Sequence, residues 1–242
     1  MNAAARFDRL DALRGAAMVW MAGFHLSFDL NTFHLLHPAQ NFYRDPFWTL
    51  QRVAIVSLFL LCAGLGQAIA LHAGQRPARF WRRWAQVAGC ALLVSVGSAL
   101  MFPRSWISFG VLHGIALMLL LSRAAWRLPL PALPVLALAC IALPPAVQHP
   151  LFDSRWTNWV GLVTHKPVTE DYVPLLPWTG VMLLGLAAGR AALAHGGGVL
   201  QGSLPPWLKP LATLGRWPLS FYMLHQPVFI GTLMGWRSEE HT

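Results

Sequence analysis

Four ionisable residues lie on one face of the first apolar segment of this 242-residue chain: Asp11, Arg14, His25 and Asp29. At about 100° per residue, the four fall within roughly 60° of one another on a helical wheel. The residues around them are mainly Ala, Met, Val, Trp, Phe and Leu, which is typical of a membrane-spanning helix. Because ionisable groups are costly in hydrocarbon, we expect these four to face protein or a water-filled cavity and to mark a functional site.

His25 and Asp29 are the candidates for catalysis on this face. One helical turn separates them, so their side chains can touch. We expect His25 to act as a general base or transient acyl acceptor, with Asp29 orienting or charging its imidazole. The alternative is a structural histidine that hydrogen-bonds a neighbouring span. Arg14 suits a phosphate or carboxylate of a substrate, and equally an ion pair with Asp11 at i, i+3.

Three later polar residues are predicted to join His25 in the outer half of the membrane. At about 1.5 Å rise per residue, this depth is reached by Arg52, His113 and Trp178. One cavity can therefore hold them, and they are candidates for stabilising an oxyanion. His113 can equally be a buried hydrogen-bonding residue.

His225 is predicted in the inner half of the membrane, nearer Arg14 and Arg216. We assign it, together with these two arginines and Asp11, to substrate binding. The alternative for His225 is again a buried hydrogen-bonding role.

The elements that must position these residues are helices in a membrane. The chain is 56% hydrophobic and 11% charged, against roughly 25% charged residues in soluble domains. We predict an all-α, polytopic helical membrane protein that forms a single domain over residues 1–242. The predicted spans are Ala12–Phe33, Val53–Leu71, Trp84–Phe102, Trp106–Leu121, Leu128–Val147, Val173–Leu193 and Leu219–Trp236.

The distribution of charge predicts the orientation of these spans. Twelve of the 18 Lys and Arg residues fall on the side that carries the N-terminus, which the positive-inside rule places in the cytoplasm. The net charge of +9 is therefore mainly a topology signal. We expect the lipid bilayer, and not nucleic acid, as a partner.

Neither a metal site nor a disulfide is expected. The three cysteines, Cys62, Cys90 and Cys140, lie in separate apolar segments without a CxxC pattern. His34 and His37, at the outer end of the first span, lack a third ligand at metal spacing. The long loop Gln148–Tyr172 is predicted outside, where Trp156 and Trp159 can bind sugar or simply lie at the membrane interface.

Five segments together resemble a known family. Asp11-x-x-Arg14-Gly15, followed by His25, resembles the first span of acyl-CoA-dependent membrane acyltransferases. Arg52 … Phe59-Leu-Leu-Cys-Ala-Gly64 resembles their next motif. Three further segments narrow the match to bacterial relatives of the heparan-α-glucosaminide N-acetyltransferase catalytic domain, over about residues 9–235: Ser108-Phe-Gly-Val-Leu-His113, Asp171-Tyr-Val-Pro-Leu-Leu-Pro-Trp178-Thr-Gly180 and Leu214-Gly-Arg-Trp-Pro-Leu-Ser-Phe-Tyr-Met-Leu-His225-Gln-Pro227.

The resemblance implies transfer of an acetyl or other acyl group from cytoplasmic acyl-CoA to a sugar or glycan on the far side of a bacterial inner membrane. It implies a catalytic histidine, which His25 matches. The lysosomal member of the family carries its active histidine in the loop after the first span, which also nominates His34 and His37. A homo-oligomer is compatible with the sequence.

Two other classes of function stay open. A proton-coupled transporter would use the polar face of the first span as a relay, although no internal repeat of the kind common in carriers is found. A catalytically idle scaffold would tolerate replacement of His25. Consumption of a thioester distinguishes the transferase from both.

Overall fold

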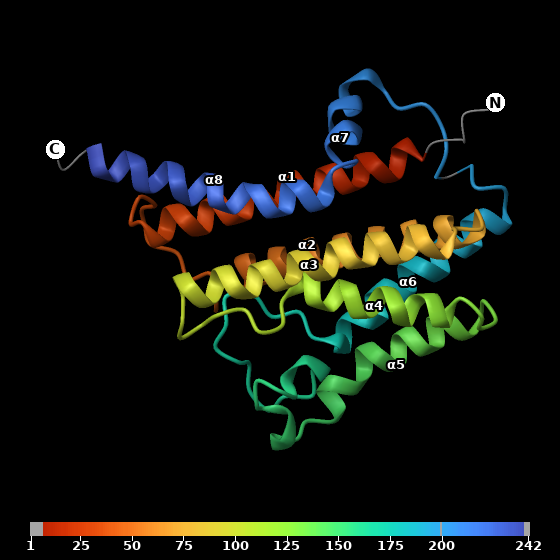
Figure 1. Cartoon of the computed structure of the whole chain (residues 1–242), viewed down its shortest axis with the longest axis horizontal. Coiled ribbons are helices and arrows are strands. Elements are labelled where there is room, and N and C mark those ends of the chain that lie inside the picture. The colour runs from red at the N-terminus through yellow and green to blue at the C-terminus, as the bar shows by residue number, and fades with distance from the viewer. Residues whose placement is uncertain (1–6, 199, 240–242) are drawn as a thin grey trace. The chain divides into compact units, whose positions relative to one another are not determined.

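A computed structural model describes residues 7–198 and 200–239, and within them all regular structure is helical. This confirms the all-α prediction. Three single-turn 3-10 helices (Pro150–Phe152, Asn158–Val160 and Pro206–Leu208) accompany the longer elements. The α-helices of the described residues are α1 (Asp8–Thr32), α2 (Pro46–His72), α3 (Pro77–Met101), α4 (Val111–Ala125), α5 (Ala132–Ala146), α6 (Leu175–Ala194), α7 (Lys209–Leu214) and α8 (Pro218–Glu239) (Figure 1).

Three of these helices, α2, α3 and α6, are long and apolar enough to cross a membrane. The side chains of Leu92, Leu93, Val96 and Leu100 on α3 are exposed, as expected of a surface that faces lipid. The apolar helices α4 and α5 are shorter, at 15 residues each. Helices α1 and α8 are long enough but carry the polar residues of the site below. The protein is therefore a helical membrane protein, and the count of seven spans and their orientation stay predictions.

The chain divides into two compact units. The first comprises residues 1–59 and 200–242, and the second comprises residues 60–199. The first unit thus holds α1, the start of α2, α7 and α8, and the second holds the rest of α2 with α3 to α6.

In the first unit, α7 packs directly on the N-terminal half of α1, as Figure 1 shows. Gly15 permits this approach, because a Cβ at this position would lie 2.0 Å from the carbonyl oxygen of Leu211. Gly215 does the same from the other side, where a Cβ would lie 1.8 Å from the carbonyl oxygen of Asp11. Small residues at a helix contact let backbones meet, which is the usual solution in membranes. The turn that leads from α7 into α8 therefore lies against Asp11 and Gly15 of α1.

An aromatic cluster fixes the chain after α1. Phe24 and Phe28 make edge contacts with Phe42, which stacks on Trp48 at 4.0 Å between ring centroids. Asn31 on α1 also exchanges two hydrogen bonds with the backbone of Gln40. These contacts hold the loop against the end of α1 that carries His25 and Asp29.

The second unit is built around α6. Gly185 and Gly189 of α6 face α2, and a Cβ at Gly185 would lie 2.4 Å from the carbonyl oxygen of Leu61. Helices α4 and α5 pack on α6 as well. Buried side chains of α2, α4, α5 and α6 form a core of the unit: Ala68, Ala125, Leu133, Ala137, Leu183 and Leu186.

The predicted fourth span, Trp106–Leu121, starts five residues earlier than α4. The helix begins at Val111 because the carboxylate of Asp171 accepts a hydrogen bond from the Val111 backbone N–H, at 2.6 Å. Such a cap satisfies one of the N–H groups that a helix N-terminus leaves without partners. Gly110 leaves room for it, since a Cβ there would lie 2.3 Å from Asp171 Oδ2.

Candidate active site

Two histidines from opposite ends of the sequence meet in the first unit. His25 Nδ1 on α1 lies 2.9 Å from His225 Nε2 on α8. Their rings stack, with centroids 5.0 Å apart and planes inclined by 26°. Phe221 and Phe229 on α8 pack against the His225 ring, and Phe24 packs against that of His25. The pair is thus enclosed by aromatic side chains.

This contact corrects the predicted depth of His225, which was expected in the inner half near Arg14 and Arg216. That estimate set the start of the last span level with the start of the first. Because α7 takes up the chain beside Asp11 and Gly15, α8 begins well along α1. His225 therefore lies level with His25.

Gln226 joins the histidine pair to Asp29. Its Oε1 atom lies 3.0 Å from His25 Nδ1, and its Nε2 atom lies 3.0 and 3.1 Å from the two carboxylate oxygens of Asp29. Asp29 is buried, with 4% of its surface exposed. The direct contact expected between His25 and Asp29 is therefore replaced by an amide bridge.

Reasoning from the first span alone missed Gln226, because it lies 201 residues from His25. Helical spacing identifies partners on the same helix only. The one available signal was its position next to His225, inside the segment that carries the family resemblance.

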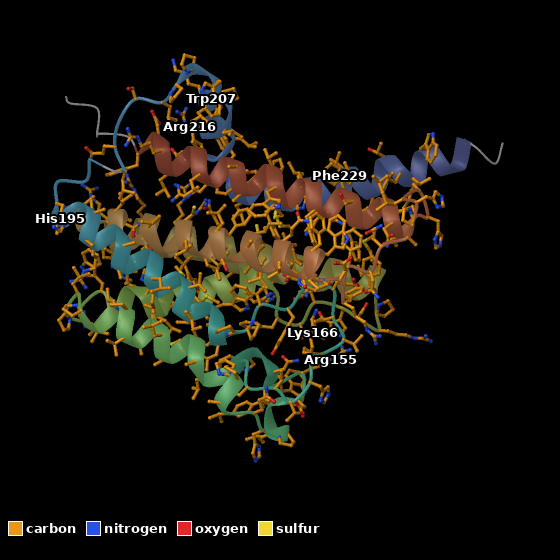
Figure 2. All side chains as sticks on the ribbon, turned by 180° about the vertical axis from the view of Figure 1, so that it is seen from behind. Arg155, Lys166, His195, Trp207, Arg216 and Phe229 are labelled. Carbon is orange, nitrogen blue, oxygen red and sulfur yellow. The ribbon has the colours of Figure 1, made fainter. Side chains whose placement is uncertain are left out.

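The opposite end of the helix pair carries two arginines paired with acidic residues of α1. Arg14 Nη1 lies 2.9 Å from Asp11 Oδ1, so the ion pair considered as the alternative role of Arg14 is formed. Arg216 Nη2 lies 3.5 Å from Asp8 Oδ1, and Figure 2 shows Arg216 beside the first turns of α1. Eleven residues of helix separate Arg14 from His25, or about 16 Å.

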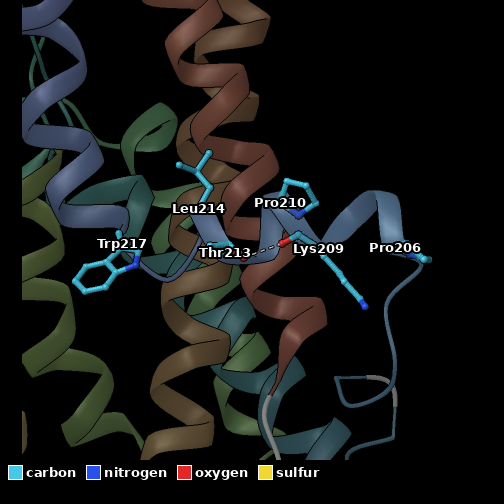
Figure 3. Close-up of a pocket in the computed structure, with 6 residues that line it drawn as sticks. All are labelled: Pro206, Lys209, Pro210, Thr213, Leu214 and Trp217. Carbon is cyan, nitrogen blue, oxygen red and sulfur yellow. Dashed lines mark hydrogen bonds between the residues drawn. The ribbon is translucent and has the colours of Figure 1, made fainter.

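A shallow, open groove runs along α7 near this end (Figure 3). Lys209 is the charged residue among those that line it. Trp207 and Trp217 are both highly exposed, which is typical of side chains at a membrane interface. The lining residues are Pro206, Lys209, Pro210, Thr213, Leu214 and Trp217.

His113 lies in the second unit and is hydrogen-bonded at both ring nitrogens. Nδ1 accepts a hydrogen bond from the Gly110 backbone N–H at 3.3 Å. Nε2 lies 3.1 Å from Ser95 Oγ, whose hydroxyl donates to the Ile107 carbonyl oxygen at 2.7 Å. These contacts match the alternative of a buried hydrogen-bonding histidine, and sequence reasoning did not identify Ser95. The catalytic role assigned to His113 stays a prediction.

The other predicted site residues make no such network. Arg52 on α2 and Trp178 on α6 are half-buried, and within the part of the chain that the structure describes neither side chain has a hydrogen-bond or ion-pair partner. His34 and His37 are exposed. In residues 7–198 and 200–239, no group of three or more His, Cys, Asp or Glu side chains is arranged to hold a metal ion.

The loop between α5 and α6 is ordered by hydrogen bonds around Asp153. The hydroxyl and backbone N–H of Thr164 both donate to its carboxylate, and these bonds lower the pKa of Asp153. Tyr172 donates to the Asn158 carbonyl oxygen at 2.7 Å, and burial, with the Asp153 charge, raises its pKa. Trp156 remains 88% exposed, so the loop presents an aromatic surface. Figure 2 marks Arg155 and Lys166 on this loop.

A histidine linked to a buried carboxylate forms a candidate active site in this helical membrane protein, and two arginines pair with acidic residues near the start of the same helix. The chain belongs to the family described as heparan-alpha-glucosaminide N-acetyltransferase, catalytic, whose model matches residues 6–227. No curated protein and no solved structure matches the chain. Family membership indicates a membrane acyltransferase, and the matched residues run through both units.

Proposed function

We propose that the protein transfers an acetyl or other acyl group from cytoplasmic acyl-CoA to an amine or hydroxyl of a sugar or glycan on the outer side of a bacterial inner membrane. The observation that carries this proposal is the cluster of His25, His225, Gln226 and Asp29. It supplies a base held in place by buried polar groups, in a chain of the acyltransferase family. Residues 1–242 are proposed to act as one transferase domain.

His25 is proposed as the base. The acceptor nitrogen or oxygen attacks the carbonyl carbon of the thioester while the imidazole takes its proton. The C–S bond then breaks, and the proton passes to the departing thiolate, which leaves as free CoA. In the two-step route, the His25 imidazole first takes the acyl group itself and passes it to the acceptor. The proposed roles of His113, Arg52 and Trp178 are to stabilise charge in the reaction or to bind substrate.

The arginines at the start of α1 and α8 are proposed to bind the phosphates of CoA. A guanidinium presents its donors in a planar fork that suits phosphate oxygens. The pantetheine arm of CoA is long and thin, which suits a path of about 16 Å along α1. Asp11 and Asp8 position Arg14 and Arg216 for this task.

The amide bridge argues against the transporter alternative. A direct proton relay along α1 would need titratable groups in contact, and Gln226 places a side-chain amide between His25 and Asp29. An amide orients its neighbours through hydrogen bonds but does not titrate in this role.

The test is acetyl-CoA turnover by purified protein in lipid, with a panel of amino sugars and oligosaccharides and free CoA as the readout. We expect release that requires an acceptor, is lost in His25→Ala and is kept in the control His72→Ala. His72 is an exposed residue at the end of α2. Release that persists in a folded His25→Ala protein, or no release with any acceptor from folded wild type, would overturn the proposal. Solute uptake without CoA release would favour the carrier.

A further inference from the structure

The hydrogen bonds of the His25 cluster determine which nitrogen of each ring carries a proton. His225 Nδ1 lies 3.1 and 2.9 Å from the backbone carbonyl oxygens of Phe221 and Tyr222. A carbonyl oxygen only accepts, so this nitrogen carries the proton and donates it. In the neutral ring, His225 Nε2 is then an acceptor.

The orientation of the Gln226 amide follows from Asp29. Both carboxylate oxygens of ionised Asp29 can only accept, so the NH₂ end of the amide must face them. The carbonyl end, Oε1, therefore faces His25 Nδ1. The orientation of a side-chain amide is assigned from its hydrogen bonds. For Gln226, the two hydrogen bonds that its NH₂ group donates to Asp29 determine the orientation.

Two acceptors thus surround His25 Nδ1: His225 Nε2 at 2.9 Å and Gln226 Oε1 at 3.0 Å. Both are satisfied only if Nδ1 carries the proton. In the neutral ring, the lone pair that can accept a proton or attack a carbonyl then lies on Nε2. In the described part of the chain, His25 Nε2 has no hydrogen-bond partner.

From this geometry we propose that Gln226 is a positioning residue that holds His25 in the Nδ1-protonated form, so that Nε2 does the chemistry. Asp29 acts through it: the carboxylate prevents the amide from turning over, and no proton moves between Asp29 and His25. The inference rests on the proposed function for its kinetic consequences and on the hydrogen bonds alone for the tautomer.

The role of Asp29 separates this arrangement from a direct carboxylate–histidine pair. In Asp29→Asn the side chain can donate as well as accept, so Gln226 is free to turn its NH₂ toward His25. That orientation favours the His25 tautomer that carries its proton on Nε2. In this tautomer, Nε2 has no free lone pair for catalysis. Asp29→Asn should therefore lower kcat by on the order of 10²-fold or more, as loss of the correct histidine tautomer does elsewhere.

The first readout needs no activity. Nitrogen-15 NMR of histidine-labelled protein in lipid nanodiscs, at about pH 8, distinguishes protonated from unprotonated ring nitrogens in neutral imidazoles. The His25 signal is identified by its loss in His25→Ala. We expect Nδ1 protonated in wild type and a population protonated on Nε2 in Asp29→Asn. A wild-type His25 protonated on Nε2, or an unchanged tautomer in Asp29→Asn, would overturn the proposal.

The second readout is kinetic and uses Gln226→Met, which keeps a side chain of similar length without its polar groups. We expect kcat to fall about tenfold, because one acceptor of His25 Nδ1 is lost while His225 Nε2 remains. KM for acetyl-CoA should not change, because Gln226 does not bind the donor. The matched control is Gln51→Met, which removes an amide that accepts a hydrogen bond from Trp20 Nε1. The kcat of this variant should not change.

The double variant Asp29→Asn with Gln226→Met completes a double-mutant cycle. If Asp29 acts only through Gln226, the double variant should be no slower than the slower single variant, since the two residues work as a unit. Fully additive losses would overturn the proposal. If wild type shows no turnover, the proposed function fails, while the NMR measurement still decides the tautomer.

Discussion

His225 Nε2 lies 2.9 Å from His25 Nδ1, although 200 residues separate them in sequence. The contact makes the last helix part of the site that the first helix begins. In the proposed arrangement, the task of His225 is to accept a hydrogen bond from the Nδ1–H group of His25 rather than to exchange a proton with substrate.

His225→Phe tests that task. Phenylalanine keeps a ring that can stack in the aromatic enclosure formed with Phe221 and Phe229, but it removes the acceptor that faces His25. We expect kcat for acyl transfer to fall about tenfold, since one hydrogen bond of about 1–1.5 kcal/mol is lost and Gln226 remains. An unchanged kcat in a folded variant would show that His225 is a packing residue only.

Arg216→Gln tests the binding of the anionic donor. Its ion pair with Asp8 is long, at 3.5 Å, and its guanidinium is suited to phosphate. We expect KM for acetyl-CoA to rise about tenfold with kcat little changed, because uniform binding is lost. Lys209→Gln is the comparison, since Lys209 lines the groove along α7. A fall in kcat at constant KM for Arg216→Gln would contradict a binding role.

Helical spacing was enough to place Asp11, Arg14, His25 and Asp29 on one face of a helix, because a helix has a known period. The apolar composition and the lengths of the apolar segments were enough to predict an all-α membrane protein. It failed where a second element enters. Depth counting misplaced His225, since it could not foresee that α7 would pack on Gly15 and shift the start of α8.

The same limit applies to the second unit. The start of α4 depends on Asp171, which lies 60 residues further along the chain from Val111. The apolar pattern alone placed that start too early. Likewise, the pairing of His113 with Ser95 comes from the packing of α4 on α3, which no local pattern predicts.

Two glycines on α1 provide a matched test of the contact with α7. At Gly15 a Cβ would meet the backbone of Leu211 at 2.0 Å, whereas at Gly23 it would meet nothing within 4 Å. Gly15→Ala should destabilise the protein by about 1–3 kcal/mol through overpacking. Gly23→Ala should be neutral or stabilising by up to ~1 kcal/mol, because alanine favours a helix. Thermal unfolding in detergent compares them, and equal midpoints would contradict the close packing of α7.

The cap on α4 predicts a graded effect at Asp171. Asp171→Ala removes the acceptor for the Val111 N–H and should cost about 1–2 kcal/mol of unfolding free energy. Asp171→Asn keeps an acceptor oxygen but loses the charge that favours a helix N-terminus, so its cost should be smaller, at about 0.3–1 kcal/mol. Denaturation of the two variants beside wild type provides the measurement. An alanine variant as stable as wild type would show that Val111 finds another partner.

The pH dependence of the loop between α5 and α6 follows from Asp153. Hydrogen bonds from Thr164 lower its pKa in the folded protein, so the folded state favours the ionised carboxylate. The resulting stabilisation is fully present above the unfolded-state pKa of about 3.9 and is lost as pH falls through the lower folded-state pKa. Protease cleavage within residues 148–172 should therefore speed up on acidification below about pH 4 in wild type. In Asp153→Asn the rate should already be raised near neutral pH and should change less with acid. The cleavage is measured with an acid-active protease and corrected for its rate on an unfolded peptide. Identical pH profiles for the two proteins would exclude Asp153 as the titrating group.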